Sequence, residues 1–158
     1  MHPKSDSNPV WSADGSKLYF QSDRNNGDTD VWFAWLREAD ALKSKEDHEQ
    51  GMYFETDTKD SGKKKKDVVS PIQIDTDRIY ERLVQVTRDS GSESVAGTDE
   101  KGEYVYFSAE NTTNGQRDLF KVKWNGEDRQ LVTKNGANPA GTTMADGGKY
   151  LYYISRGR

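Results

Sequence analysis

A strand–turn–strand unit that occurs three times constrains the fold of this chain more than any other feature. Its first copy is Asn8–Trp32, where Asp14-Gly15 supplies a tight turn between two runs of alternating apolar and polar residues. The same turn chemistry returns within Asp99–Phe107 and within Ala145–Tyr153. A unit that repeats in this way predicts a fold built from copies of one small antiparallel sheet.

The spacing of the repeat indicates which kind of sheet is repeated. The turn glycines Gly102 and Gly148 are 46 residues apart, whereas Gly15 and Gly102 are 87 apart. The excess of 41 residues equals the length of the charged segment Arg37–Asp77, which we therefore interpret as an insertion into the repeat. A period in the forties with four short strands per unit is typical of a β-propeller blade, and a generic β-sandwich is the alternative.

We therefore predict an all-β fold, a partial β-propeller of about two and a half to three four-stranded antiparallel blades. Residues 1–36 are expected to form the first blade, 37–77 a charged, disordered insertion with a return segment, 78–127 the second blade, and 128–158 a third, truncated blade. The strand Asp30–Leu36 is apolar on both faces, which indicates a sheet packed between two neighbours. So few blades cannot close a ring, and we expect the chain to be a piece of a larger protein.

Composition supports a folded β protein with one polar segment. Leu, Ile, Val and Phe make up only 26 of the 158 residues, a content at which disorder is an alternative. The 17 aromatic residues gather in the strand-like runs, however, and their large side chains can close a β core. The segment Lys43–Lys66 is rich in charge and poor in apolar residues, and we expect it to be mobile. Just before it, Glu38–Lys43 has the composition of one helical turn.

Several classes of function are excluded by composition. The chain has no cysteine, which excludes disulfides, a thiol nucleophile and a Cys-ligated zinc. A sequence pI of about 5.3 with intermixed Lys and Glu argues against a nucleic-acid partner. No apolar run reaches the length of a membrane span.

Nothing in the sequence predicts a catalytic residue. The two histidines are His2, at the terminus, and His48, in the charged insertion, so neither is expected to be held rigidly enough to serve as a base for a serine nucleophile. No isolated pair of acids in apolar surroundings is evident, which argues against a glycosidase-type carboxylate pair.

One loop contains the candidate metal ligands Asp23, Asn25, Asp28 and Asp30, whose spacing superficially resembles a calcium loop. The loop lacks the downstream bidentate glutamate of a helical calcium hand. Asp118 holds the place of Asp30 in the next unit and has no acidic neighbours there. We therefore favour a turn-capping role for these acids and expect no metal or other cofactor.

The aromatic residues and the turn residues are expected to have structural roles. Strict alternation along the strands favours an inter-blade core over a ligand platform for Trp32, Trp35, Tyr104, Tyr106, Phe120, Trp124, Tyr150, Tyr152 and Tyr153. The positions expected to define the turns and blades are Asp14, Gly15, Asp30, Trp32, Gly102, Asp118, Phe120 and Gly148.

Two stretches resemble known propellers. Trp11-Ser-Ala-Asp-Gly-Ser-Lys-Leu-Tyr-Phe20, with Ser22-Asp-Arg24 and Asp30-Val-Trp32 after it, resembles the repeat shared by TolB and the tricorn protease propellers. The charged insertion followed by Pro71-Ile-Gln-Ile-Asp-Thr-Asp-Arg-Ile-Tyr-Glu-Arg-Leu-Val84 is similar to a segment between two blades of bacterial tricorn-like proteases. Prolyl oligopeptidase-type enzymes carry related repeats, but the insertion moves the resemblance toward the tricorn-like proteins.

This resemblance implies a non-catalytic propeller that gates and guides peptide substrates and scaffolds a separate serine peptidase domain. Nothing in the chain matches that domain. The implied partners are peptides or proteins bound by the full-length propeller and the rest of the parent protease, in a bacterium, with the periplasm favoured over the cytoplasm. The alternatives are a TolB-like protein-interaction module and the propeller of a prolyl oligopeptidase-type hydrolase. An open blade face also predicts that the fragment associates with itself.

Overall fold

The first of three antiparallel sheets is a four-stranded meander, in which each strand pairs with its neighbour in the sequence. The computed structural model describes residues 5–25, 27–54, 71–134 and 136–155. The strands of the first sheet are β1 (Asp6–Trp11), β2 (Lys17–Ser22), β3 (Asp30–Trp35) and β4 (Leu83–Gln85). The tight turn between β1 and β2 is closed by the Gly15 amide, which donates to the Ser12 carbonyl at 3.0 Å.

The second sheet repeats this arrangement. Its strands are β5 (Ser94–Thr98), β6 (Tyr104–Asn111), β7 (Gln116–Lys123) and β8 (Gln130–Leu131). Its turn is closed in the same way, because the Gly102 amide donates to the Asp99 carbonyl at 3.0 Å. Equal order and equal turns confirm that the two sheets are copies of one unit.

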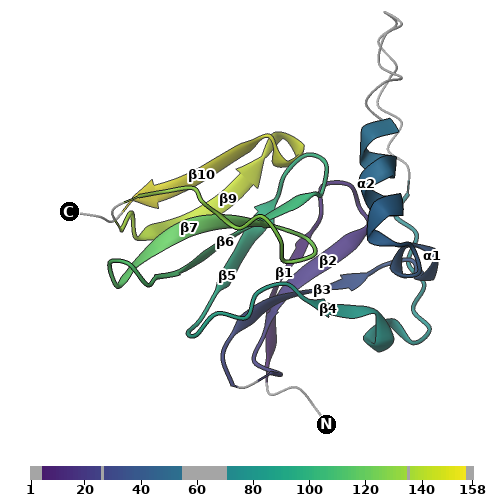
Figure 1. The fold of residues 1–158 in the computed structure, drawn as a ribbon, viewed down its shortest axis with the longest axis horizontal. Coiled ribbons are helices and arrows are strands. Elements are labelled where there is room, and N and C mark those ends of the chain that lie inside the picture. Colours follow the sequence, from purple (N-terminus) through teal and green to yellow (C-terminus); the bar gives the residue numbers. More distant parts are fainter. Residues whose placement is uncertain (1–4, 26, 55–70, 135, 156–158) are drawn as a thin grey trace, which may run out of the picture.

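The third sheet consists of β9 (Pro139–Ala145) and β10 (Tyr150–Ser155), joined by a 3₁₀ turn at Asp146–Gly148. The first strands of the three sheets follow one another, with β5 lying between β1 and β9 (Figure 1). Successive meanders that place their first strands side by side are blades of a propeller. The prediction of an all-β, partial propeller is confirmed.

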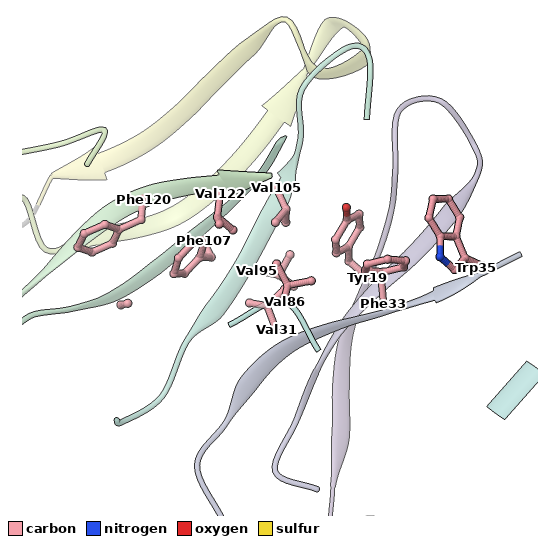
Figure 2. Packing of buried hydrophobic residues seen from close by; sticks show 11 residues of the cluster. Tyr19, Val31, Phe33, Trp35, Val86, Val95, Val105, Phe107, Phe120 and Val122 are labelled. Atoms are coloured by element: carbon pink, nitrogen blue, oxygen red, sulfur yellow. The ribbon is translucent and has the colours of Figure 1, made fainter. Parts of the chain in front are cut away.

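The hydrophobic core fills the space between the first two sheets (Figure 2). Tyr19 and Phe33 of the first sheet and Val105 and Phe107 of the second are fully buried. The rings of Tyr19 and Phe33 lie 5.3 Å apart. Because full burial of one such apolar side chain contributes about 1.5–3 kcal/mol, the contact between the blades is a large contribution to the stability of the fold. Ala34, on the opposite face of β3, is also buried, as the two-faced apolar pattern of this strand predicts.

The insertion contains more order than its composition predicts. The helical turn α1 (Glu38–Ala41) is present, but Lys45–Phe54, expected to be mobile, forms the helix α2. Ser44 and Asp47 explain part of this difference, because the Ser44 hydroxyl accepts from the Asp47 amide at 3.1 Å and the Asp47 carboxylate accepts from the Ser44 amide at 3.2 Å. Such reciprocal capping stabilises a helix start whatever its hydropathy. The rest of the expected mobile segment lies outside the described residues.

The return segment is fastened to the end of β3 by a buried arginine. Arg82 ends the 3₁₀ helix Ile79–Arg82 and is 8 % exposed. Its guanidinium donates to the carbonyls of Trp35 at 3.2 Å and Asp77 at 2.8 Å. These bonds lead the chain directly into β4, which pairs with β3. The insertion therefore lies within the first sheet, between its third and fourth strands.

The sheet boundaries consequently differ from the expected blade ranges. β4 was placed in the second blade (78–127) but belongs to the first sheet, and β8 was placed in the third (128–158) but belongs to the second. Both strands are short, three and two residues, and each pairs with only one neighbour. Their sequences are too short to show the alternation of apolar and polar residues that would assign them to a sheet. Among the described residues, no helix is long and apolar enough to cross a membrane.

Candidate functional site

A groove of about 410 Å³ runs along the first strands of the three sheets. β1 lines it with Pro9–Trp11, β5 with Ala96–Thr98, and β9 with its turn contributes Thr143–Gly148. Trp11 leaves half of its surface exposed beside this groove. Small and apolar side chains with one exposed indole suit the docking of an extended chain, and Asp146 is the titratable group in the lining.

A second cavity, of about 220 Å³, lies between the turns of the first two sheets and the insertion. Lys17, only 4 % exposed, places its ammonium 2.9 Å from the Ser16 hydroxyl, 3.4 Å from an Asp14 carboxylate oxygen and 3.3 Å from the Gly102 carbonyl. The ammonium also lies 4.7 Å from the centroid of the Trp35 ring. Burial lowers the pKa of Lys17, and the Asp14 carboxylate opposes this effect.

The Lys17 ammonium is engaged on all sides, so its role is to tie the first turn to the second. The same contact explains the glycine in the second turn. Gly102 has φ +66°, and a Cβ atom added there would lie 2.5 Å from the Asp14 side chain. Gly148, with φ +98°, faces the second turn in the same way, since its added Cβ would lie 2.5 Å from the Asp99 carbonyl carbon. Each of these turn glycines thus lets one sheet approach the preceding one.

His48 is held in place, contrary to the expectation from its position in the charged insertion. Its ring stacks on Trp35 with centroids 4.6 Å apart and planes 9° apart, and it meets Trp124 edge-on at 5.1 Å. Its Nε2 lies 3.0 Å from the Asp40 carbonyl. Burial, with the charges of Lys17 and Lys43, lowers the pKa of His48. Because Trp35 and Trp124 come from different sheets, α2 fastens the insertion across both.

The candidate metal ligands do not converge. Asp23 accepts from the Ser5 amide at 2.8 Å, Asn25 donates to the Gln85 side chain at 3.0 Å, and Asp30 accepts from that same side chain at 2.8 Å. Asp28 lies in the same loop, half-buried. Across the part of the chain that the structure describes, no three His, Cys, Asp or Glu residues form a group able to hold a metal ion.

Asp118 makes the hydrogen bonds of a turn cap. The fully buried carboxylate accepts from the Thr133 hydroxyl at 2.9 Å and from the amides of Ala137 and Gly136 at 3.0 and 3.3 Å. Asn111 donates to it at 2.9 Å. Burial raises the pKa of Asp118, but these donors outweigh it and lower the pKa overall. Asp118 therefore joins the end of the second sheet to the chain that enters the third.

Asp30 holds the equivalent place in the first sheet but has a different environment, which the sequence did not reveal. Its carboxyl group faces that of Glu93, a residue only 1 % exposed. The pair is not evident in the sequence, because Glu93 is 63 positions from Asp30 and lies in a polar stretch. The one available signal is the lack of an acid at the corresponding place before β9, where Asn138 stands; its amide donates to the Arg117 carbonyl at 2.9 Å, as the Glu93 amide donates to the Thr29 carbonyl at 2.8 Å.

The remaining structural positions lie in the turns and between the blades. Gly15 has φ +68° in the first turn. Trp32 carries the Arg24 guanidinium 5.0 Å from its ring centroid. Phe120 stacks on Phe107 at 5.8 Å in the second sheet.

The three sheets define a segment of a β-propeller, and a groove runs along their first strands. Residues 10–157 match the family described as dipeptidyl peptidase IV (DPP IV) N-terminal region, and the chain belongs to this family. No curated protein matches the chain.

Two TolB proteins are among the solved structures that match this chain. A putative TolB from Agrobacterium tumefaciens matches at 13% identity with a TM-score of 0.61, covering 99% of this chain and 40% of that one. TolB from Acinetobacter baumannii matches at 12% identity with a TM-score of 0.44, covering 97% and 38%. The chain thus spans about two fifths of the length of these structures. The first likeness supports the partial propeller, and at this identity it concerns the fold alone.

Proposed function

We propose that this chain is the non-catalytic propeller segment of a tricorn-like serine protease, where it guides peptide substrates and scaffolds the peptidase domain. The observation that carries the proposal is the groove along β1, β5 and β9 with the exposed indole of Trp11. A row of inner strands offers backbone and small side chains to an extended peptide, and an exposed aromatic residue can anchor one apolar side chain of it. Membership of the DPP IV N-terminal family supports a propeller that works beside a peptidase.

The family match also favours a second candidate, the propeller of a prolyl oligopeptidase-type hydrolase. In both candidates the propeller binds substrate and another domain cleaves it. The candidates differ in that domain, and the parent reading frame separates them. A Gly-x-Ser-x-Gly hydrolase domain would favour the second candidate, and a PDZ-like domain before a peptidase domain would favour the first.

Peptide binding to the chain tests the shared part of the proposal. The probe is a fluorescein-labelled short peptide rich in Ala and Leu, followed by fluorescence anisotropy. Trp11→Ala is expected to weaken binding about tenfold, the usual loss for an aromatic anchor, while Trp11→Phe keeps most of the affinity. Tyr80→Ala is the matched control, because Tyr80 is 68 % exposed and does not line the groove.

The same preparation is expected to release no cleaved peptide. Equal affinity of wild type and Trp11→Ala would reject the groove as the peptide site. Cleavage by a preparation free of other proteases would reject the non-catalytic role.

A further inference from the structure

The first two sheets end with the same backbone device. In the second sheet, the amides of Val132 and Thr133 donate to the Leu119 carbonyl at 2.8 and 3.3 Å, and the Thr133 hydroxyl accepts from the Leu119 amide at 2.9 Å. In the first sheet, Val86, Thr87 and Val31 take these three places, with distances of 2.9, 3.4 and 2.8 Å. Asp118 and Asp30 therefore precede equivalent residues.

The two aspartates have different partners. Asp118 receives two backbone amides, a hydroxyl and an Asn amide, which together satisfy a carboxylate. Among the described residues one N–H group donates to the Asp30 carboxyl, the Gln85 amide at 2.8 Å, and no N–H or hydroxyl donor is assigned to its buried Oδ1. The Glu93 carboxyl group is the neighbour with which Asp30 can share a proton. The Thr87 hydroxyl, which corresponds to Thr133, donates to Glu93 at 3.1 Å instead. Instead of two backbone amides, Asp30 has the Glu93 carboxyl group as its neighbour.

Glu93 also belongs to the joint between the first and second sheets. Its amide donates to the Thr29 carbonyl at 2.8 Å, and its carbonyl accepts from the Gln21 side chain at 2.9 Å. Thr29 and Ser92 form a parallel bridge. The carboxyl group of Glu93 is thus carried by the short connection that leads from β4 into β5.

The charges around the pair favour a bound proton. Asp28 and Asp89 add negative potential. The nearby guanidinium groups have other partners, because Arg129 pairs with Asp89 and Arg117 donates to the carbonyls of Ser92 and Ser108. Arg24, on the loop before β3, pairs with Asp6. Within the described residues no cation bonds to Asp30 or Glu93. Burial, and then the charges of Asp30 and Asp89, raises the pKa of Glu93 to about 8.

We propose that Asp30 and Glu93 share one proton and form a pH-sensitive latch between the first two blades. With the proton present, one carboxyl donates to the other and the β4–β5 connection stays hydrogen-bonded to Thr29, directly before β3. Loss of the proton leaves two carboxylates in contact in a buried place, and their repulsion separates Glu93 from Thr29. Such pairs of buried acids cannot both ionise without a large penalty.

The direction of the pH dependence follows from linkage. The pKa of Glu93 is raised from about 4.5 in the unfolded chain to about 8 in the folded one, so between these values only the folded chain holds the proton. Stability from the pair is therefore fully present below about pH 4.5 and is lost as pH rises toward 8. At its steepest, the unfolding equilibrium constant rises about tenfold per pH unit.

Glu93→Gln tests the latch, because the amide imitates the protonated acid and does not titrate. Urea unfolding of the 158-residue chain is measured from about pH 5 to pH 8.5, around the pKa of about 8. The wild type is expected to lose stability relative to Glu93→Gln over this range and to be the less stable of the two at its upper end. Glu110→Gln is the matched control, since Glu110 is exposed at the end of β6 and should keep the wild-type profile. Parallel profiles for wild type and Glu93→Gln would overturn the proposal.

Two further measurements protect the test against a variant that fails to fold. Carbon-13 NMR of the wild-type Glu93 carboxyl is expected to show a titration midpoint near 8, and a midpoint below about 6 contradicts the shared proton. Asp30→Asn removes the second charge and is expected to move that midpoint down. Amide exchange supplies the local readout: protection of the Glu93 amide, which bonds Thr29, is expected to fall at high pH, whereas that of Ala137, which bonds Asp118, is retained. Equal loss at both amides would show global unfolding in place of a latch.

Discussion

At the scale of single residues, the two buried aspartates show how one sequence position can have two chemistries. Asp118 is a carboxylate held by donors, and Asp30 is half of an acid pair. The sequence predicted a capping role for both from their common place before a strand, which describes the contacts of Asp118 well. The partner of Asp30 could not be predicted, because Glu93 reaches it only through the path of the chain between the two sheets.

Asp118→Asn is expected to destabilise the chain by about 2–4 kcal/mol. The asparagine NH₂ group would replace one carboxylate oxygen, so the donors that face this oxygen would lose their acceptor. Urea unfolding at neutral pH measures this loss. Asp146→Asn serves as the control, since Asp146 is exposed and its φ of +52° suits asparagine. Equal stability of the two variants would mean that the four hydrogen bonds of Asp118 contribute little.

At the scale of elements, the long strands were predictable and the contacts of the insertion were not. The alternation in Lys17–Ser22 and the two-faced apolar pattern from Asp30 predicted β2 and β3 well. β4 was assigned to the wrong blade because it is short and pairs with β3 across the insertion. The helix α2 was not predicted, because its charged composition gives no indication that one histidine docks on the sheets. The stacking of His48 depends on two tryptophans from different sheets.

The docking of α2 is expected to weaken in acid. The pKa of His48 is lowered on folding, so the stability it contributes is present above its usual value of 6.5 and is lost as pH falls below it. His48→Phe keeps a ring on Trp35 but does not titrate. Since His48 is only partly buried, the wild type should lose roughly 0.5–1 kcal/mol relative to this variant on acidification. Thermal unfolding of both proteins at pH values on either side of 6.5 gives the difference, and coincident pH profiles would contradict the docking of a neutral imidazole.

At the scale of the whole molecule, the third sheet differs from the other two because its second strand, β10, has a hydrogen-bonded neighbour on one side only among the described residues. β2 and β6 each pair on both sides, whereas β10 pairs only with β9 within the described residues. Its outer residues Tyr150, Tyr152 and Ile154 are 49 %, 57 % and 65 % exposed. An exposed apolar strand with a free edge is a template for another strand.

We therefore predict that the chain, studied by itself, associates through β10 as its concentration rises. Sedimentation velocity over a concentration series is expected to show a dimer or larger species for the wild type. Tyr152→Lys with Ile154→Lys should shift the chain toward the monomer, because two charges on the strand face oppose pairing with a second copy. Tyr80→Lys is the matched control: Tyr80 is an aromatic residue outside the sheets that is 68 % exposed, and its loss should leave association unchanged. A wild type that stays monomeric at high concentration would contradict the prediction. Association that is lost with Tyr80→Lys but kept in the β10 variant would place the contact at another surface.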